Sequence, residues 1–425
     1  MRLRESKSVH REAPTAQGED LARAVKSTAP WLAALRLRLD ERIASGLSRS
    51  AQPAPEGLID LAGNDYLGLR RSERLVEACQ SAAAEFGVGA GSSRLVDGTT
   101  ELHERVEARF ATFKGAASAR IFPTGYSANL AALTALPSPG DLILQDKLNH
   151  ASLVDAGRLA SARRVGRPVT MRAFPHRDAA RAGDIGARHL QRDPDAIVWL
   201  TTDSVFSMDG DLADLGQLAA LRASLNKLAR DRGGVGGACL IVDEAHATGV
   251  LGECGAGVDE LAGHVADIAI STAGKALGSL GGVITGPREV VEAIDNFARP
   301  FIYSTAVPPT QLACIDAALD VLRDEPGRRR RLQEIIESVR TRLREQGWPV
   351  ADAATDPTPI VPLITGDVEA AQSLARRLRE RGLHAPAIRP PTVARGAARV
   401  RLSLHAGLTD GEIDRLLDAL ALQIR

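Results

Sequence analysis

Short apolar runs alternate with amphipathic segments along the chain from about residue 60 onward. Five of these runs are apolar at consecutive positions, a pattern typical of strands whose two faces are both buried. Between them, the segments 99–113 and 214–231 carry apolar residues at i, i+3, i+4 and i+7, which predicts amphipathic helices. The five expected strands lie within ARIFPTG (119–125), DLILQDK (141–147), AIVWLTTD (196–203), CLIVDEAH (239–246) and DIAIST (267–272).

This order of strands and helices predicts an α/β protein with a mostly parallel sheet covered by helices. The prolines at 308 and 309 mark a change, after which a charged helix pattern and short apolar runs predict a small C-terminal α/β domain. Within that domain, we interpret the arginine run 328–331 as the solvated start of a helix rather than an anion-binding patch. We expect a flexible N-terminal extension over 1–28, a helical segment over 29–62 that packs on the small domain, a large domain over 63–305 and a small domain over 306–425.

The composition is that of an ordinary soluble globular protein, with 425 residues, 44% hydrophobic residues, 25% charged residues and zero formal net charge. Such a balance gives no reason to expect nucleic acid or a membrane surface as a partner. The first twenty residues lack the apolar core of a signal peptide, and no run approaches the roughly 18 residues of a membrane span, so we expect a cytoplasmic protein. The four cysteines are scattered without metal-ligand spacing, which indicates a reducing compartment and no metal site.

Polar residues follow several of the expected strands, at the edge where open parallel sheets bind their ligands. The small residues that open a helix after the first strand would leave free amide groups that favour a phosphate. An aspartate directly after an apolar strand needs a cationic partner or several hydrogen bonds, and an arginine salt bridge is the ordinary solution. The polar and small residues at these strand ends are Thr124, Gly125, Tyr126, Asp203, Ser207, Asp243, His246, Thr272 and Lys275.

Lys275 is the most informative of these residues because small residues flank it in STAGKALGS (271–279). A desolvated lysine loses its proton more readily and can then form a Schiff base with a carbonyl compound. A P-loop lysine is the alternative, but position 269 is alanine instead of glycine and Ala276 follows the lysine. The glycines of GVGAGSS (87–93) do not follow GxGxxG order, and GYSAN (125–129) lacks the last glycine of a nucleophile elbow.

Pyridoxal phosphate is a cofactor that would use a phosphate-binding helix start, a carboxylate in a crevice and a desolvated lysine together. Its aldehyde condenses with lysine, and a carboxylate at its ring nitrogen keeps the ring protonated as an electron sink. Two hypotheses from other classes stay open at this point. One is a nucleotide-dependent oxidoreductase or NTPase on a similar sheet, and the other is a catalytically silent homologue that serves as a binding subunit.

From about residue 30 to its end, the chain resembles the α-oxoamine synthases, a family of fold-type I pyridoxal-phosphate enzymes. The resemblance implies a large domain with a mostly parallel seven-stranded sheet, a small C-terminal α/β domain and an active site at a homodimer interface. The blocks that carry it are NDYLGL (64–69), GAGSSRLVDGTTELHERVE (89–107), TGYSAN (124–129), NHASLVDA (149–156), TDSVFSMDGD (202–211), VDEAHATGVLG (242–252), STAGKALGS (271–279), FARPFIYST (297–305) and AIRPPTV (387–393).

The resemblance also implies roles for individual residues. Lys275 would bind the cofactor covalently and later act as the acid–base group, while Asp243 would pair with the pyridine nitrogen. His150 would stack on the cofactor ring, and His246 and Ser207 would hydrogen-bond near its ring oxygen. Gly125, Tyr126 and Thr272 would bind the phosphate, and Thr305 would contact the phosphate of the neighbouring subunit. The residues implied for substrate binding are Asn64 and Arg389 for the amino-acid carboxylate, with Thr392 nearby, and Arg49 for the acyl substrate.

The implied reaction is a decarboxylative condensation of L-alanine with a pimeloyl thioester, carried either by CoA or by a carrier protein. FIYST (301–305) and AIRPPTV (387–393) favour this reaction over those of relatives that use glycine or serine with other acyl-CoA substrates. Position 203 is Asp where many members have Glu, and position 244 is Glu where Asp is common. Both departures keep the negative charge.

Overall fold

The computed structural model of the protein describes residues 29–162 and 167–421. The chain divides into two compact units, residues 1–55 and residues 56–425. The described part of the first unit contains the helix α2 (Pro30–Ala44), and the predicted flexible extension over 1–28 lies outside the described residues. The packing of the segment 29–62 on the small domain stays a prediction.

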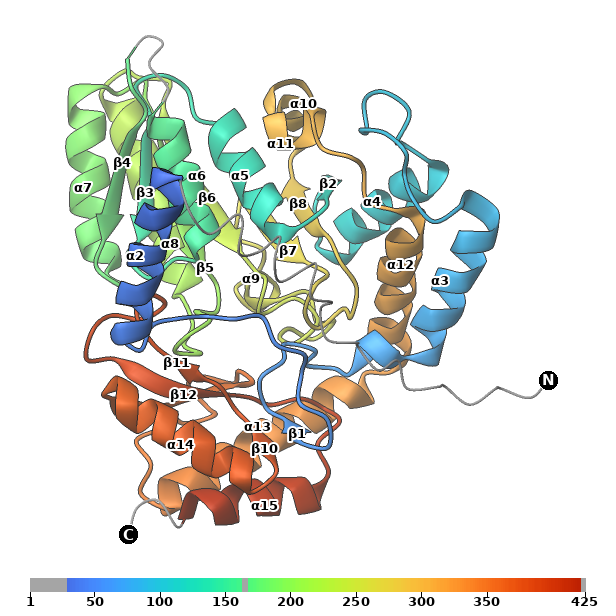
Figure 1. Ribbon diagram of the computed structural model, residues 1–425. Coiled ribbons are helices and arrows are strands. Elements are labelled where there is room, and N and C mark those ends of the chain that lie inside the picture. Colours follow the sequence, from blue (N-terminus) through green and yellow to red (C-terminus); the bar gives the residue numbers. More distant parts are fainter. Residues whose placement is uncertain (1–28, 163–166, 422–425) are drawn as a thin grey trace. The chain divides into compact units, whose positions relative to one another are not determined.

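A seven-stranded sheet lies at the centre of the second unit (Figure 1). Its strands are β2 (Ser118–Phe122), β3 (Leu142–Asp146), β4 (Thr170–Phe174), β5 (Ile197–Asp203), β6 (Gly237–Asp243), β7 (Ile268–Thr272) and β8 (Gly282–Gly286). They are ordered β2-β8-β7-β6-β5-β3-β4, and β8 runs antiparallel to both of its neighbours while the other adjacent pairs are parallel. The sheet confirms the predicted fold class and all five expected strands, and it adds β4 and β8.

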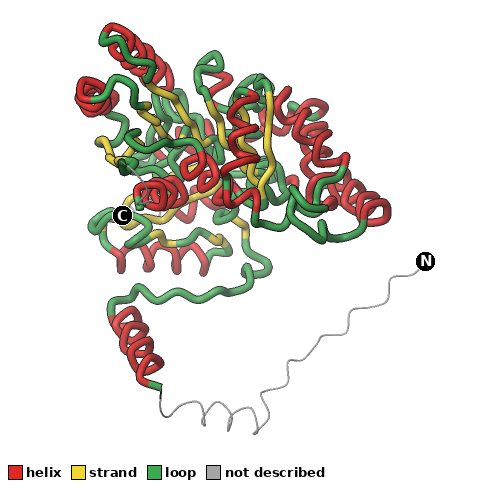
Figure 2. Tube along the Cα trace, turned by 90° about the horizontal axis from the view of Figure 1, so that it is seen from above, coloured by secondary structure: helices red, strands yellow, loops and turns green. Residues whose placement is uncertain are grey.

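Consecutive residues of the central strands face two different hydrophobic cores. Leu240 and Val242 of β6 belong to one core, whereas Ile241 between them belongs to the other. In the same way Val198 of β5 faces the first core and Trp199 the second. Figure 2 shows helices on both sides of these strands, which explains why the strands are apolar at every position rather than at every second one.

Side-chain caps set the start of several helices. Asp214 Oδ1 accepts a hydrogen bond from the Gln217 amide at 2.8 Å, so the helix predicted over 214–231 begins at Leu215. In the second unit up to residue 324, the helices are η1 (Leu69–Arg71), α3 (Glu73–Phe86), α4 (Glu101–Phe113), α5 (Gly125–Ala135), α6 (Ala151–Ser161), α7 (Ala179–Arg192), α8 (Leu215–Asp231), α9 (Val258–Leu261), α10 (Arg288–Phe297), α11 (Arg299–Ile302) and α12 (Pro309–Asp324).

The C-terminal part of the chain builds two smaller sheets. β9 (Ile360–Gly366), β11 (Ala387–Ile388) and β12 (Ala398–Ser403) form an antiparallel sheet in the order β11-β12-β9, and β1 (Ile59–Asp60) pairs in parallel with β10 (Leu383–His384). The helices of this part are α13 (Gly327–Glu345), α14 (Val368–Glu380) and α15 (Asp410–Ala421). None of the helices that the structure describes combines the length and the apolarity needed to span a bilayer.

The arginine run at the start of α13 differs from its prediction at one position. Arg329 is buried instead of solvated. Its guanidinium donates to the carbonyl oxygens of Leu322 and Glu253 at 2.7 and 2.9 Å. Leu322 lies in the last turn of α12, where unpaired carbonyl oxygens attract a cation, so the arginine closes that helix end.

Candidate active site

Two buried carboxylates lie at the carboxyl ends of neighbouring strands. Asp203 and Asp243 are the last residues of β5 and β6 and are partners in the parallel register. Asp243 accepts hydrogen bonds from Asn129 Nδ2 at 2.7 Å and from the amide of Ala245 at 2.9 Å. An amide side chain therefore occupies the place where we expected an arginine. Because an amide carries no charge, the negative charge of Asp243 stays available for a cationic ligand.

A chain of polar groups connects Asp243 with His150, the residue before α6. Asn129 Nδ2 also donates to Ser152 Oγ at 2.8 Å, and Ser152 Oγ lies 2.7 Å from His150 Nδ1. Asn129 Oδ1 is buried and has no hydrogen-bond partner among the described residues. An unpaired acceptor in a polar site is the kind of group that a ligand or water satisfies.

Asn129 and Ser152 were not among the residues predicted from the sequence. Both are buried polar side chains on the otherwise apolar inner faces of α5 and α6. A buried Asn or Ser needs a hydrogen-bond partner, and that requirement is a signal that the sequence contained. It could not identify the partner, because Asn129 and Asp243 are 114 residues apart.

Burial controls the charge of the groups around these carboxylates. It lowers the pKa of His150, and the charge of Lys275 adds to this effect while Asp243 opposes it. Burial and the charge of Asp243 together raise the pKa of Asp203 well above its usual value. The amide of His150 donates to Asp203 Oδ2 at 2.7 Å. The site thus favours the neutral forms of His150 and Asp203. Asp243 lies beside them and accepts hydrogen bonds from two donors.

Lys275 follows β7 in the loop that joins it to β8. Burial lowers the pKa of its amine to about 8, although Asp243 and Asp203 oppose the shift, and Arg401 adds to it. A pKa in this range leaves a substantial neutral fraction near physiological pH, which a nucleophile or a general base requires. The residues singled out at three strand ends of the sequence therefore interact in one place.

A second polar cluster surrounds His246. Tyr66 Oη lies 2.7 Å from His246 Nδ1 and 3.1 Å from Asn64 Oδ1. Arg401 Nη2 donates to Asn64 Oδ1 at 3.1 Å and to Tyr66 Oη at 3.3 Å. Burial lowers the pKa of His246 well below its usual value, with help from Lys275 and Arg401, and burial raises the pKa of Tyr66 to about 12. Both side chains are therefore neutral near pH 7.

Arg401 was missed in the sequence, although it is one of two arginines, with Arg399, that are buried in the strand β12. Its side chain is buried, and its Nε has no hydrogen-bond partner among the described residues. The predicted substrate residues Arg389 and Thr392 lie in the turn after β11, where the amide of Thr392 donates to the carbonyl oxygen of Arg389 at 3.1 Å. Arg49 belongs to the N-terminal unit.

The start of α5 lies against the end of β7. Thr124 caps the helix by accepting the amide of Ser127 at 3.1 Å. The amides of Gly125 and Tyr126 have no hydrogen-bond partner within the described chain. A Cβ on Gly125 would lie 3.3 Å from Thr272 Cβ, so a side chain there would crowd Thr272. The three residues predicted to bind phosphate thus lie around one helix start.

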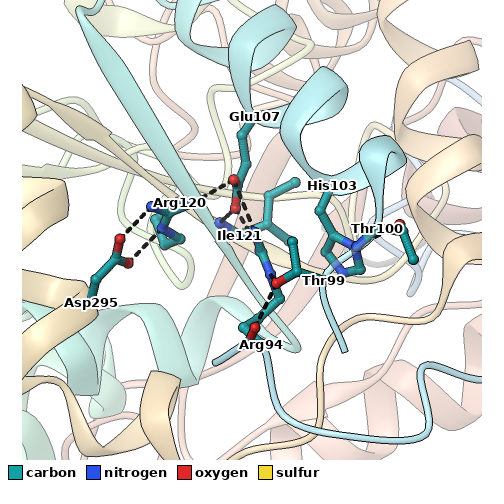
Figure 3. A network of polar contacts seen from close by, with 8 residues as sticks. All are labelled: Arg94, Thr99, Thr100, His103, Glu107, Arg120, Ile121 and Asp295. Atoms are coloured by element: carbon teal, nitrogen blue, oxygen red, sulfur yellow. Dashed lines mark hydrogen bonds and ion pairs between the residues drawn. The ribbon is translucent and has the colours of Figure 1, made fainter. Parts of the chain in front are cut away.

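Figure 3 shows a polar network that supports the loop before α4. Glu107 accepts hydrogen bonds from Arg94 Nη1 at 2.7 Å and from Arg120 Nη1 at 2.6 Å, and Arg120 also pairs with Asp295 at 2.5 Å. The ring of Phe301 lies 5.6 Å from the guanidinium carbon of Arg94 and 5.4 Å from that of Arg120. Stacked charges of this kind hold the loop against the segment that follows α10.

Thr305 and Ser207 lie on segments that isolated β-bridges hold in place. Thr305 is exposed and forms an isolated bridge with Ser93, the neighbour of Arg94. Ser207 lies in a tight turn after β5, which an antiparallel bridge between Val205 and Leu212 closes. The roles predicted for Thr305 and Ser207 remain predictions.

Comparisons with known proteins agree with this arrangement. Residues 56–420 match the aminotransferase class I and II family. The chain is 43% identical over 404 residues to an 8-amino-7-oxononanoate synthase of Chromohalobacter salexigens, covering 93% of this chain and 97% of the relative. A solved 8-amino-7-oxononanoate synthase of Francisella tularensis has a TM-score of 0.70 at 27% identity and covers 87% of this chain and 98% of its own.

A serine palmitoyltransferase of S. paucimobilis, solved with bound PLP, has a TM-score of 0.79 at 25% identity and covers 92% of this chain and 96% of its own. The match to such structures, together with the sheet and its strand-end residues, identifies the fold as that of the fold-type I pyridoxal-phosphate-dependent transferases. The chain therefore belongs to the aminotransferase class I and II family, within the branch of the 8-amino-7-oxononanoate synthases.

Proposed function

We propose that this chain uses pyridoxal 5'-phosphate to condense L-alanine with a pimeloyl thioester, with loss of CO2, in biotin synthesis. The observation that carries the proposal is Lys275, whose amine has a pKa of about 8 and interacts with the buried carboxylates Asp203 and Asp243. A lysine that is partly neutral near pH 7 and interacts with the buried Asp243 suits both Schiff-base formation and proton transfer.

The residues present fit the cofactor. Asp243, held by two donors, offers a buried negative charge to a protonated pyridine nitrogen, and the unpaired Asn129 Oδ1 lies beside it. The free amides of Gly125 and Tyr126 suit the phosphate because they sit at the positive end of α5. When bound, the cofactor supplies an electron sink for the substrate carbon that loses its proton.

Lys275 would then hold and move the proton. Its neutral amine can accept the α-proton of the amino acid, and the negative charge of Asp243 stabilises the charge that the amine gains. Burial favours the neutral form of His150. A neutral imidazole can stack on the cofactor ring, whereas a charged imidazolium would repel a protonated pyridine. His246 is neutral too and is oriented by Tyr66 at 2.7 Å.

Arg401 is the best-supported group for the carboxylate of the amino acid. Its guanidinium is buried, and its Nε has no partner in the part of the chain that the structure describes. Asn64 Oδ1, on a residue predicted to bind the same carboxylate, lies 3.1 Å from its Nη2. A buried guanidinium with a free donor is completed by a planar carboxylate. We therefore add Arg401 to Arg389 and Thr392 as a candidate for substrate binding.

A homodimer is part of the proposal. Val88, Leu95, Val96 and Tyr303 are large apolar side chains that are more than half exposed. They lie on the loop before α4 and on the segment that ends in Thr305. Exposed apolar side chains concentrated on two adjoining segments are typical of a surface that a partner covers. A second copy would bring Thr305 to the phosphate of its neighbour.

Other α-oxoamine synthases, such as 2-amino-3-ketobutyrate CoA ligase or a serine-condensing enzyme, are the competing assignment. The solved serine palmitoyltransferase has the higher TM-score, 0.79 against 0.70 for the solved 8-amino-7-oxononanoate synthase. Sequence identity favours the synthase, because the Chromohalobacter salexigens enzyme is 43% identical to this chain and the serine palmitoyltransferase is 25% identical. The substrates are tested by the absorbance change of the holoenzyme on addition of L-alanine, glycine or L-serine. Thiol release from pimeloyl, acetyl and palmitoyl thioesters completes the test. We expect L-alanine and the pimeloyl thioester to give the largest responses.

The covalent link is tested with the purified holoenzyme. Wild-type protein should be yellow, with a visible band that borohydride removes. Lys275→Ala should fold normally and lose this reducible adduct, whereas Lys227→Ala, an exposed lysine on α8, should keep it. A reducible adduct that persists at another lysine in Lys275→Ala would overturn the assignment.

A further inference from the structure

We propose that His176 is a positioning residue for the cofactor site: as an imidazolium, it ties the loop that leads to His150 to the turn that carries Ser207. This inference rests on the proposed function for the identity of the cofactor. The link itself rests on the geometry of His176 alone.

The contacts of His176 require a charged ring. His176 follows β4, and its Nδ1 lies 3.0 Å from Asp146 Oδ1 while its Nε2 lies 2.7 Å from Asp211 Oδ2. A neutral imidazole carries one N–H, and an ionised carboxylate can only accept, so both contacts are hydrogen bonds only when both ring nitrogens are protonated. The ring also packs edge-on against Phe206, with centroids 4.4 Å apart.

Each carboxylate belongs to a different part of the site. Asp146 ends β3, and its Oδ1 accepts the amide of Leu148 at 2.8 Å, which shapes the loop that leads to His150. Asp211 closes the turn after β5, because its carbonyl oxygen accepts the amide of Phe206 at 3.0 Å. Ser207 lies inside that turn. One side chain that follows β4 thus joins the two segments that carry His150 and Ser207.

The charges around His176 favour the imidazolium. Besides Asp146 and Asp211, the groups that act on this cluster are Arg177, whose amide donates to Asp146 at 2.8 Å and whose guanidinium lies 3.4 Å from Asp211, together with Asp356 and Asp203. The hydrogen bonds to Asp146 and Asp211 outweigh partial burial and raise the pKa of His176 to about 9. The ring therefore stays charged at neutral pH and loses its proton as the pH rises through about 9.

The charge can be tested directly, whatever the ligand. Histidine is labelled selectively with ¹⁵N in the full-length protein, and His176→Gln assigns the signal. At pH 7.5 we expect both ring nitrogens of His176 to be protonated, with titration near pH 9. A single neutral tautomer of His176 at pH 7.5 would overturn the proposal.

The positioning role is tested by titrating apoprotein with pyridoxal phosphate and following absorbance. In the wild type we expect affinity to fall as the pH rises through about 9, because His176 then loses the proton that holds the two loops. The side chain of His176→Gln carries no charge and has both of its N–H donors on one nitrogen, so it cannot replace a ring that donates from two nitrogens. Its affinity should be about tenfold weaker at pH 7.5, and this fall should be absent.

The matched control is His189→Gln. His189 lies on α7, and among the described residues its ring bonds to the Gly140 carbonyl oxygen at 2.9 Å and to no carboxylate. It should bind like the wild type. Wild-type affinity and pH dependence in His176→Gln would sink the positioning role. Failure of every variant, and of the wild type, to bind the cofactor would instead refute the proposed function, and the labelling experiment would still decide the charge of His176.

Discussion

Asp203 and Asp243 have the same side chain, adjacent positions and similar burial, yet the groups around them differ. Asp243 accepts hydrogen bonds from an amide side chain and a backbone amide, which suit its ionised form. Asp203 accepts one, from the His150 amide, and the negative charge of Asp243 opposes its ionisation. At the scale of a residue, burial and the charge of its neighbour thus favour the neutral form of Asp203, whereas two hydrogen-bond donors hold Asp243.

This difference predicts opposite tolerance to an uncharged isostere. Asp203→Asn should keep cofactor affinity within about threefold, because the native side chain is already favoured in its neutral form. Asp243→Asn should weaken it by about a hundredfold or more, because it removes the charge that faces the pyridine nitrogen. Titration of apoprotein with pyridoxal phosphate measures both. Equal losses in the two variants would contradict the assignment.

The arginine that binds the amino-acid carboxylate can be identified in the same way. Arg401→Lys keeps the charge but cannot form the fork that a carboxylate accepts, so we expect kcat/KM for L-alanine to fall about tenfold or more. Arg389→Lys is the matched comparison. A larger loss in Arg389→Lys than in Arg401→Lys would return the role to the residue predicted from the sequence.

At the scale of elements, a buried ion pair fixes the loop after β6. Lys114, at the end of α4, donates from Nζ to Glu244 Oε2 at 2.9 Å and to Thr248 Oγ1 at 3.0 Å, and also to the carbonyl oxygen of Ala256. Glu244 Oε1 accepts the amide of Val258 at 2.9 Å. This explains why position 244 is Glu, because its side chain is long enough to reach from the end of β6 to the start of α9.

Gly257 shows how closely this acid approaches the backbone. A Cβ on Gly257 would lie 1.7 Å from Glu244 Oε2, and its φ of 119° is a conformation that favours glycine. The chain accommodates the buried carboxylate by leaving out a side chain where the loop passes it.

Breaking the Lys114–Glu244 pair should be costly. Lys114→Met leaves a buried carboxylate without its counter-ion, so we expect the free energy of unfolding to fall by about 3–5 kcal/mol. Glu244→Gln in the same protein should recover part of that loss. Guanidinium denaturation measures both, and Lys227→Met, which removes an exposed pair with Asp231, should change stability by less than about 1 kcal/mol. A small effect of Lys114→Met would show that backbone donors alone satisfy Glu244.

At the scale of the whole molecule, the exposed apolar side chains next to the network of Figure 3 are the basis of the proposed homodimer. The arginines of the network order the loop before α4 without any partner, and Val96 on that loop stays 81% exposed. A rigid apolar loop loses little conformational entropy on binding, which favours tight association.

Val96→Glu should therefore disrupt the proposed dimer. We expect the mass measured by sedimentation to fall from about twice the chain mass to that of one 45.0 kDa chain, with weaker cofactor retention because Thr305 no longer reaches a neighbour. Val235→Glu, at an even more exposed valine, should leave the mass unchanged. A dimer that persists in Val96→Glu would move the interface elsewhere.

Local sequence determined the strands that are apolar at every position, because burial on two faces leaves no other pattern. β4 and β8 were not predicted because neither has the sequence pattern of a central strand. β4 is an edge strand with an exposed Arg172, and β8 is a five-residue run bounded by glycines. Neither shows the continuous apolar stretch that marked the central strands.

The sequence by itself also determined which strand ends carry Lys275, Asp243 and the opening of α5, since parallel strands present these ends at one edge of the sheet. Only the tertiary structure decided which groups complete the site. Arg401 meets Asn64 across 337 residues, and His176 meets Asp211 across 35. Hydrogen bonds and charges act over a few ångströms, so partners distant along the chain become known only when folding has placed them together.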